Sequence, residues 1–453
     1  MKNPAPEITE KELNELIQSA KDVLQANWSG SFTRPSKNQY PHQWSWDSVF
    51  IAFGYTHYDK DRAEQELRHL FEGQWKNGMI PQIIFDQEHQ SEKYFPGPDF
   101  WQSETSPNAP DHIKTSGICQ PPIHATGVRH LIEYAPDRER AVAFASEIFP
   151  RLKAWHQYLD RERDPNNEGL VYIRHPWESG QDNSPIWDGI LNRIEIEPSY
   201  IPAYSRKDIN NVEPDERPSK PEYDTYVYLV NFFRERKYDE AKIRNDDCPF
   251  LVQDVLFNTL LCKANQDLAE IAEIIGENPE PFKTRADQIA DKMNDKLWLD
   301  REQMYVDYDL KASKQIQARV LSGFLPIYAS IPDQNRKQQI FEYLNTHCFC
   351  QMTDSCFPAP SYDRSGDDYS ARTYWRGPVW INMNWLLYEG LKQYGFDDYV
   401  KQVRNSIIQL PFLSGFREYF DTNSGEGYGI ENFSWTAALL LDILYREEST
   451  AIQ

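Results

Sequence analysis

The sequence predicts an all-α protein, a toroid of helices with its functional site at one rim. Two observations predict this fold class. Apolar residues recur at helical spacing along nearly the whole chain, in a continuous series that approaches a dozen helices. Strand-like alternation is scarce, and long loops that share an aromatic- and proline-rich composition separate the helices.

Amphipathic stripes predict the individual helices. They run over 13–24, 145–159, 252–264, 289–297, 316–324, 381–391 and 435–443. The long loops between helices cover roughly 28–47, 85–122, 165–224, 355–380 and 411–434. No glycine- and serine-rich linker marks a boundary, so we expect one domain over 1–453 with loop or cap insertions at approximately 85–122 and 165–224. The most polar part, 203–224, is the segment we expect to move.

Charge and composition exclude several classes of protein. The 453 residues include 48 Lys+Arg and 70 Asp+Glu, a net charge of −22, which argues against binding nucleic acid or an anionic membrane. No apolar run approaches the ~20 residues of a membrane span, and the charged N-terminus does not resemble a secretory signal. We therefore expect a cytoplasmic protein with no membrane partner. A homo-oligomer is possible, because closed symmetric assemblies are common.

Cysteine and histidine patterns give no indication of a metal or a cofactor. The six cysteines are scattered through a long chain and predict reduced thiols rather than a disulfide framework. Cys348 and Cys350 lie close together, but no second pair or histidine cluster completes a zinc site. The 13 Trp, 26 Tyr and 23 Phe are unusually many. Such rings fill a core or stack against flat ligands such as sugars.

The first loop of chemical interest reads YPHQWSWD and spans 40–47. Trp44 and Trp46 offer faces for a pyranose ring, while Gln43 and Asp47 can bond its hydroxyl groups. The alternative is that Trp46 belongs to the core and Asp47 caps the following helix.

The second loop reads HPWESGQDNSPIWD. Ser184 and Pro185 are typical of a helix start, so Asp182 would lie just before it, between Trp177 and Trp187. Burial beside rings raises the pKa of a carboxyl group, which suits a general acid. The alternative is an Asp that only caps a helix.

The third loop, FREYFDTNSGEGYG, starts at Phe416 and is followed by FSWT. Its three glycines are not followed by Lys-Ser/Thr, so a phosphate-binding loop is weakly supported. A tight loop that holds a carboxylate near a ligand fits better. Glu418 is the candidate for chemistry, and we expect Glu426 to be solvated.

Two carboxylates on separate loops that are rich in aromatic residues are typical of a glycoside hydrolase. In such an enzyme one carboxyl group protonates the leaving oxygen, and the other activates water or attacks the sugar. Taken together, the loops resemble glycoside hydrolase family 63 and its clan of (α/α)₆-barrel enzymes, which includes the trehalases. In its compact length the chain resembles the enzymes of the bacterial mannosylglycerate and glucosylglycerate hydrolase branch. The motifs that carry the resemblance are YPHQWSWD (40–47), YFPGPDFW (94–101), QPP (120–122), GQDNSPIWD (180–188), RPSKPEYD (217–224), YWRGPVW (374–380) and 418–429 with FSWT.

The resemblance implies an inverting α-glycosidase in which Asp182 is the general acid and Glu418 the base, with their carboxyl groups about 6.5–9.5 Å apart. It implies no metal or cofactor. The implied sugar-binding residues are Tyr40, Gln43, Trp44, Trp46, Asp47, Gln120 and Trp177, with Tyr374, Trp375, Gly377 and Trp380 on the opposite wall. Tyr94, Arg217 and Tyr223 would face the leaving group.

These inferences predict an enzyme that releases a hexose from 2-O-α-glucosylglycerate, mannosylglycerate or both. The glycerate carboxylate would need a fixed cation in a protein this acidic, and Arg217 offers a bidentate one. One alternative is an α-glucosidase for a neutral disaccharide or oligosaccharide. The other is a non-catalytic sugar-binding protein on the same fold, which would not need both Asp182 and Glu418.

Overall fold

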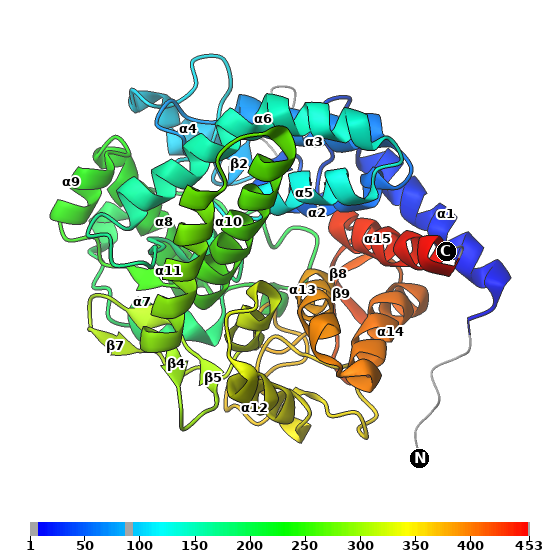
Figure 1. Cartoon of the computed structure of the whole chain (residues 1–453). Helices are drawn as coiled ribbons and strands as arrows, with labels where there is room; N and C mark the ends of the chain where they lie inside the picture. The colour runs from blue at the N-terminus through cyan, green and yellow to red at the C-terminus, as the bar shows by residue number, and fades with distance from the viewer. Residues whose placement is uncertain (1–7, 87–93, 452–453) are drawn as a thin grey trace.

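A closed ring of inner helical elements forms the centre of the molecule. The computed structural model describes residues 8–86 and 94–451. Within them, each inner element contacts the next, and the last, α15, contacts both α2 and α13 and so closes the ring (Figure 1). The inner elements are α2 (Ser45–Thr56), α5 (His124–Tyr134), α10 (Val255–Ile275), the 3₁₀ helix Leu321–Ala329, α13 (Ile381–Leu391) and α15 (Ser434–Ala451).

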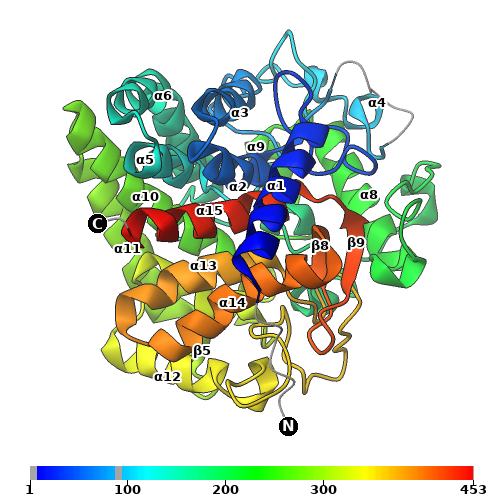
Figure 2. The same ribbon diagram turned by 90° about the vertical axis from the view of Figure 1, so that its right-hand side faces the viewer.

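A second layer of helices covers this ring, and the chain alternates between the two layers (Figure 2). Helix α1 packs on α15, α3 on α2, α6 on α5, α11 on α10, α12 on the 3₁₀ helix and α14 on α13. This arrangement is the expected (α/α)₆ barrel. The outer helices are α1 (Glu10–Asn27), α3 (Lys60–Glu72), α6 (Arg138–Tyr158), α11 (Glu280–Lys296), α12 (Gln334–Leu344) and α14 (Asp397–Ser414).

Burial follows the two layers. Every residue of α2 is buried, because this helix is covered on all sides. Helix α3 instead buries one stripe, which includes Ala63, Leu67 and Leu70, and exposes its other face. The inner helix α2 is therefore buried all round, whereas the outer helix α3 is amphipathic.

The shorter elements lie in the connections. The helices are α4 (Pro98–Trp101), α7 (Asp188–Leu191), α8 (Lys220–Glu235) and α9 (Glu240–Asn245). The strands pair antiparallel, as β1 (Gln43–Trp44) with β2 (Ile83–Ile84), β3 (Val252–Gln253) with β6 (Tyr308–Asp309), β6 with β7 (Lys314–Gln315), β4 (Trp298–Leu299) with β5 (Met304–Tyr305), and β8 (Arg417–Phe420) with β9 (Gly427–Glu431).

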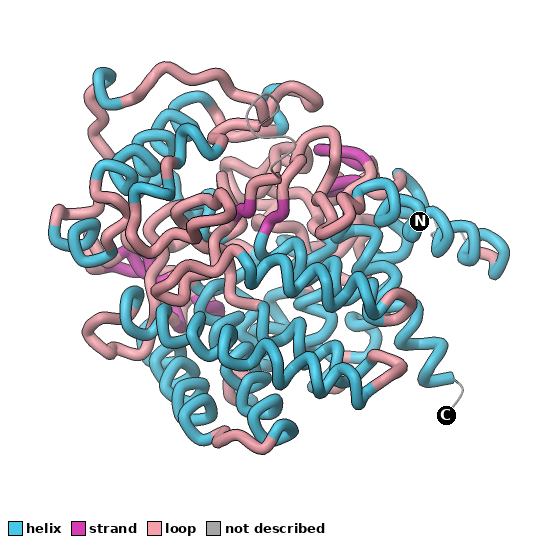
Figure 3. Tube along the Cα trace, turned by 90° about the horizontal axis from the view of Figure 1, so that it is seen from above, coloured by secondary structure: helices cyan, strands magenta, loops and turns pink. Residues whose placement is uncertain are grey.

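The long connections precede the N-terminal ends of inner elements and gather on one side of the molecule, where Figure 3 shows the loops. Segment 28–44 leads into α2, 345–380 into α13, and the β8–β9 hairpin into α15. The predicted site loops therefore meet at one rim. Part of the insertion expected at 85–122, residues 87–93, lies outside the described residues.

Two predicted segments have a different structure from the one expected. The stripe over 316–324 is not an α-helix: it follows directly on β7 and contains the start of the 3₁₀ helix. Pro326 has no N–H for a helical hydrogen bond, and a Cβ at Gly323 would lie 2.5 Å from the Tyr305 carbonyl oxygen. The expected loop 411–434 contains the last turn of α14 and the β8–β9 hairpin.

The expectation of six reduced thiols is wrong for one pair of cysteines. Cys350 and Cys356 form a disulfide, with their Cα atoms 5.9 Å apart. The turn between them brings the two sulfurs together, which cysteine spacing alone does not reveal. Cys119, Cys248 and Cys262 are buried free thiols. None of the described helices is long and apolar enough to cross a membrane.

Candidate active site

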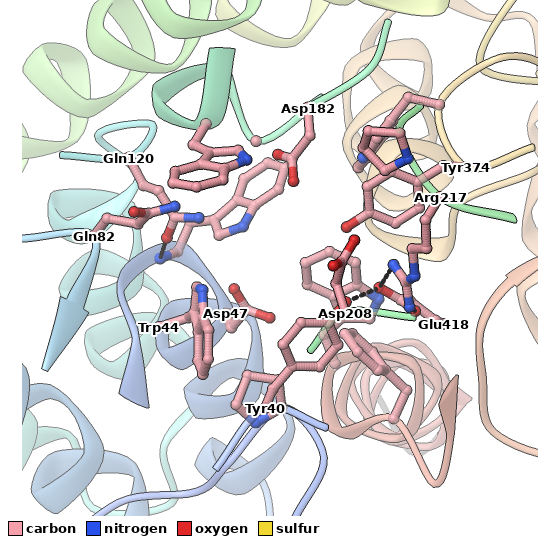
Figure 4. A pocket seen from close by; sticks show the side chains of 18 of the residues that line it. Tyr40, Trp44, Asp47, Gln82, Gln120, Asp182, Asp208, Arg217, Tyr374 and Glu418 are labelled. Atoms are coloured by element: carbon pink, nitrogen blue, oxygen red, sulfur yellow. Dashed lines mark hydrogen bonds and ion pairs between the residues drawn. The ribbon is translucent and has the colours of Figure 1, made fainter. Parts of the chain in front are cut away.

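The loops of the rim enclose a cavity that is partly open to solvent (Figure 4). Carboxylates, an arginine and aromatic rings line it, and they come from several of the long connections of the rim. The lining residues are Pro35, Tyr40, Trp44, Trp46, Asp47, Gln82, Tyr94, Phe95, Gln120, Trp177, Gly180, Asp182, Asp208, Arg217, Pro218, Tyr223, Tyr374, Trp375, Trp380, Glu418, Phe433 and Trp435.

Asp182 points into this cavity from a tight turn (Figure 4). Gly180 begins the turn with a φ of +73°, and a Cβ there would lie 2.4 Å from the Trp46 ring, so only glycine fits. As predicted, the Ser184 hydroxyl caps the following 3₁₀ turn and Pro185 is its first residue. The Tyr226 hydroxyl donates to the Asp182 carbonyl oxygen at 2.7 Å and fixes the turn from α8.

Burial raises the pKa of Asp182 to about 7. Arg217 opposes this shift, whereas the negative charges of Glu418 and Asp208 add to it. Asp182 can therefore hold a proton near neutral pH, which is the requirement for a general acid.

A buried carboxylate behind the turn anchors it. Glu178 accepts hydrogen bonds from both terminal nitrogens of Arg163, at 2.8 and 2.9 Å, and from the backbone N–H of Arg174 at 2.7 Å. It also accepts the backbone N–H of Cys119, next to Gln120. Burial opposes the ionisation of Glu178, but the two arginines outweigh it and lower its pKa to about 2.

Glu418 lies at an irregularity of the β8–β9 hairpin, where the register shifts between Arg417 and Tyr419. Such a bulge redirects a side chain. The Glu418 carboxylate accepts the Tyr40 hydroxyl at 2.9 Å, both terminal nitrogens of Arg217 at 3.2 and 2.6 Å, and the Ile430 N–H at 3.2 Å. Glu418 is buried, whereas Glu426 at the hairpin tip is exposed, as expected for Glu426.

Asp47 is a second buried acid of the cavity and lies in the first turn of α2. Burial raises its pKa well above the usual range, and the negative charges of Glu418 and Asp182 contribute to the shift. Asp47 points into the cavity from the wall formed by α2 (Figure 4). The structure thus places Asp47 in the cavity, where we expected from the sequence a residue that binds sugar hydroxyl groups.

Aromatic rings make up most of the walls. Trp44 meets Tyr40 and Tyr94 edge-on, at 5.2 and 5.1 Å between ring centres. On the other wall, the rings of Trp375 and Trp380 are parallel and 3.8 Å apart. Such faces can stack against the C–H groups of a pyranose.

Tyr374 lies beside these rings with a φ of +33°, a strained value for a non-glycine residue. The Arg217 guanidinium lies over the Tyr374 ring at 4.6 Å. Trp177, Gln120 and Tyr223 also line the cavity, as expected. The Gln120 side-chain oxygen accepts the Trp46 N–H at 3.3 Å.

Two residues expected to bind sugar lie outside the cavity lining. Gln43 is fully buried, and its side-chain amide is occupied by Glu66 and by His69, at 2.9 and 2.6 Å. Gly377 packs against the backbone of Ser370, where a Cβ would lie 2.4 Å from the carbonyl oxygen. Both residues support the loops from behind, so we correct these two placements.

Arg217 lines the cavity, but its guanidinium binds Glu418 rather than facing the cavity as a free cation. The sequence could not reveal this pair, because 201 positions separate the two residues. Sequence reasoning also missed Gln82 and Asp208. A single polar residue within the apolar run 79–85 was a usable signal for Gln82, whereas Asp208 is one of many charges in a polar loop.

One cluster far from the cavity has the composition of a metal site. Asp442 of α15 accepts hydrogen bonds from His57 and His130, at 2.8 and 2.7 Å, and from Trp385 at 2.8 Å. Arg446 completes its partners at 3.1 Å. Every polar contact of this carboxylate is thus internal, and the cluster ties the far ends of inner helices together.

Known proteins similar to this chain are glycoside hydrolases, in agreement with the two carboxyl groups of the cavity. A model of the family described as "Mannosylglycerate hydrolase MGH1-like glycoside hydrolase domain" matches residues 40–436. The chain is 49% identical to the mannosylglycerate hydrolase of Rubrobacter radiotolerans over 432 residues, which are 95% of this chain and 97% of that protein. It is 33% identical to the glucosylglycerate hydrolase of Mycolicibacterium hassiacum over 450 residues, covering 95% and 98% of the two chains.

Solved structures give the same result. The crystal structure of the GH63 mannosylglycerate hydrolase from Thermus thermophilus in complex with Tris and D-glycerate matches with a TM-score of 0.87 and 42% identity, over 94% of this chain and 99% of that one. The neutral trehalase Nth1 from Saccharomyces cerevisiae, 17% identical with a TM-score of 0.56 over 93% and 76% of the chains, shares the fold. The resemblance seen in the sequence is confirmed: the chain belongs to the mannosylglycerate hydrolase MGH1-like family of glycoside hydrolases.

Proposed function

We propose that this protein is an inverting α-glycosidase that hydrolyses an α-hexosyl glycerate, mannosylglycerate or glucosylglycerate, to the hexose and glycerate. The observation that carries the proposal is a buried acid with a pKa of about 7, Asp182, in the same aromatic cavity as the buried carboxylate of Glu418. The names of the full-length relatives support the substrate class.

In this mechanism the two carboxyl groups act from opposite sides of the sugar. Asp182 donates its proton to the glycosidic oxygen as the bond from that oxygen to the anomeric carbon breaks. Glu418 takes a proton from a water molecule whose oxygen attacks the anomeric carbon from the other face. The products are β-hexose and glycerate, and both carboxyl groups then exchange protons with solvent to begin another cycle.

We assign the hexose to the part of the cavity between Trp44 and Asp47 on one wall and Trp375 and Trp380 on the other. The glycerate would lie toward Tyr94, Arg217 and Tyr223, all of which line the same cavity. We also propose that the whole chain acts as one catalytic domain in the cytoplasm. Its assembly into a homo-oligomer remains an expectation.

A neutral disaccharide or oligosaccharide is the second candidate substrate. The observation that favours it is the engagement of Arg217 by Glu418, because no other Lys or Arg lines the cavity among the described residues. The fold is also shared with a trehalase.

Hexose release from mannosylglycerate, glucosylglycerate and trehalose tests the proposal. We expect the wild type to release hexose from a glycerate glycoside, and D182N and E418Q each to lower kcat by about 100-fold or more. Near-normal turnover by either variant would refute its assigned role. Release from trehalose alone would establish the neutral substrate instead.

Asp47 provides a control for the identity of the acid, because its pKa is also raised. Fluoride leaves without protonation, so an α-hexosyl fluoride bypasses the general acid. We expect the fluoride to restore most of the turnover of D182N but not that of D47N. The reverse result would assign the acid role to Asp47.

A further inference from the structure

The Glu418 carboxylate has no free acceptor position. One oxygen accepts the Tyr40 hydroxyl at 2.9 Å and an Arg217 nitrogen at 3.2 Å. The other accepts the second Arg217 nitrogen at 2.6 Å and the Ile430 N–H at 3.2 Å. A carboxylate offers about four lone-pair positions, so all are filled. The pair is also shielded from water, since both side chains are only 2% exposed.

A base in this state cannot act on water. To take a proton, Glu418 must first accept a hydrogen bond from the attacking water molecule, and one of the present donors must leave. Ile430 donates from the backbone of β9, and the Tyr40 ring is packed edge-on between Trp44 and Phe433. Arg217 supplies two of the donors from a long loop, so its departure alone frees a position on each oxygen.

Arg217 needs another anion before it can leave. A buried guanidinium without a partner is strongly unfavourable. Asp208 is already bound by Arg206 through both of its oxygens. Asp182 must keep its proton to act as the acid, and burial raises the pKa of Asp47 well above its usual range, so that this carboxyl group holds a proton as well. A carboxylate carried into the cavity by the substrate is the remaining partner.

We infer that the carboxylate of an anionic aglycone takes Arg217 from Glu418 and thereby frees the base. One bidentate guanidinium–carboxylate pair replaces another, so Arg217 is never left in the cavity without a partner. Arg217 is then a specificity-determining residue that makes the chemical step, and not only binding, depend on the negative charge of the substrate. This inference rests on the proposed function. It explains how Arg217 can bind Glu418 in the free enzyme and the carboxylate of the aglycone in the complex.

The first experiment compares two substrates of the wild type, α-mannosylglycerate and the neutral glycoside in which glycerol replaces glycerate. We expect kcat to be about 100-fold lower for the neutral glycoside, because it leaves the buried ion pair intact. Saturating formate, a carboxylate small enough to enter beside the neutral glycoside, is expected to raise that kcat about tenfold.

Equal kcat values within about threefold, with a difference only in KM, or no increase with formate, would overturn the inference and leave the proposed function in place. Hydrolysis of neither of these glycosides, nor of glucosylglycerate, would refute the proposed function itself. The two failures are therefore distinguishable.

The second experiment uses R217Q, which removes the charge but keeps a polar side chain of similar length. We expect its kcat for the neutral glycoside to rise about tenfold above that of the wild type, while its kcat for mannosylglycerate falls, so that the two values converge. A residue with only a structural role would lower both values. Equal loss on both substrates in a folded R217Q would therefore contradict the inference.

Y40F is a further test. It removes the Tyr40 hydroxyl from Glu418 and so opens one acceptor position while Arg217 stays in place. We therefore expect the ratio of kcat between the two substrates to shrink in Y40F, though less than in R217Q, and a ratio that stays at the wild-type value would contradict the inference. If circular dichroism shows that R217Q is unfolded, the formate experiment on the wild type decides alone.

Discussion

At the scale of single residues, Asp182 and Glu418 have different chemical properties because their surroundings differ. Burial raises the pKa of Asp182 to about 7, whereas Glu418 is held by the Arg217 guanidinium. Residue types, motif order and the family resemblance selected both as candidates from the sequence, and both line the cavity. The pairing of Glu418 with Arg217 was not visible there, because it depends on a side-chain direction set by a bulge and a distant loop.

The pKa of Asp182 predicts the alkaline limb of the pH–rate profile. The acid must be protonated in the free enzyme, so kcat/KM should fall as the pH rises above about 7. Asp208 contributes to the raised pKa of Asp182 through its negative charge. In D208N we therefore expect the alkaline limb to move to lower pH, by on the order of half a pH unit.

The matched control for D208N is D215N, which removes an exposed charge from the same polar loop. We expect its pH profile to coincide with that of the wild type. An alkaline limb that stays in place in D208N, or moves equally in both variants, would show that Asp208 does not act on the acid.

At the scale of elements, the turns before the inner helices carry the site, and buried charges fix them. The Asp182 turn depends on Glu178, which joins the turn to Arg163 and to the backbone near Gln120. Sequence reasoning identified the turn from Gly180, Ser184 and Pro185, whose roles are local. It missed Glu178, because a buried ion pair between distant residues leaves no local pattern.

We predict that E178Q loses both stability and activity. The substitution leaves Arg163 buried without its charged partner, which costs about 3–5 kcal/mol of unfolding free energy in comparable pairs. Denaturant unfolding measures this loss, and kcat should fall as the Asp182 turn loosens. E147Q, which breaks a solvent-exposed pair with Arg68, is the control and should cost about 1 kcal/mol or less. Equal small losses in the two variants would contradict the anchoring role.

Asp254, the N-cap residue of α10, and Asp307, which lies between β5 and β6, form a buried pair of acids with a consequence for stability. Burial raises the pKa of Asp307 to about 6, and burial together with repulsion from Asp307 raises that of Asp254 further. The folded state therefore holds protons that the unfolded state releases, and the free energy of unfolding falls as the pH rises from about 4 through about 6.

In D307N we expect the free energy of unfolding to fall less between about pH 4 and about pH 6 than in the wild type, by on the order of 1–3 kcal/mol. The amide oxygen can still accept the Val255 N–H, which now donates to Asp307 at 2.7 Å. Melting temperatures measured across this range give the comparison. Parallel curves for the two proteins would show that the pair does not titrate with folding.

At the scale of the whole molecule, the ring of inner elements places the N-terminal ends of distant helices at one rim. Periodicity predicted helices of both layers, among them α1, α6 and α11 in the outer layer and α10, α13 and α15 in the inner ring, and the length and composition of the loops predicted where the cavity lies. The 3₁₀ helix Leu321–Ala329 was missed because its conformation depends on Gly323 packing against the distant Tyr305. The disulfide between Cys350 and Cys356 likewise depends on a turn that spacing does not define.

The motifs identified the loops that form the cavity, but some of the motif side chains that we expected in the cavity do not line it. Asp47, Asp182 and Glu418 line the cavity, whereas Gln43 and Gly377 support it from behind. Some residues of a motif determine the shape of the loop, and others present chemical groups to the cavity. The sequence does not distinguish the two contributions, because the direction of each side chain is set by packing across the rim.

The measurement that tests the central claim most directly is proton NMR of the protein with mannosylglycerate or glucosylglycerate, recorded before the released sugar can mutarotate. The account predicts that β-hexose appears first and that the α anomer follows at the rate of mutarotation. Initial release of α-hexose would contradict the direct attack of a water molecule activated by Glu418, and with it the roles assigned to both carboxyl groups.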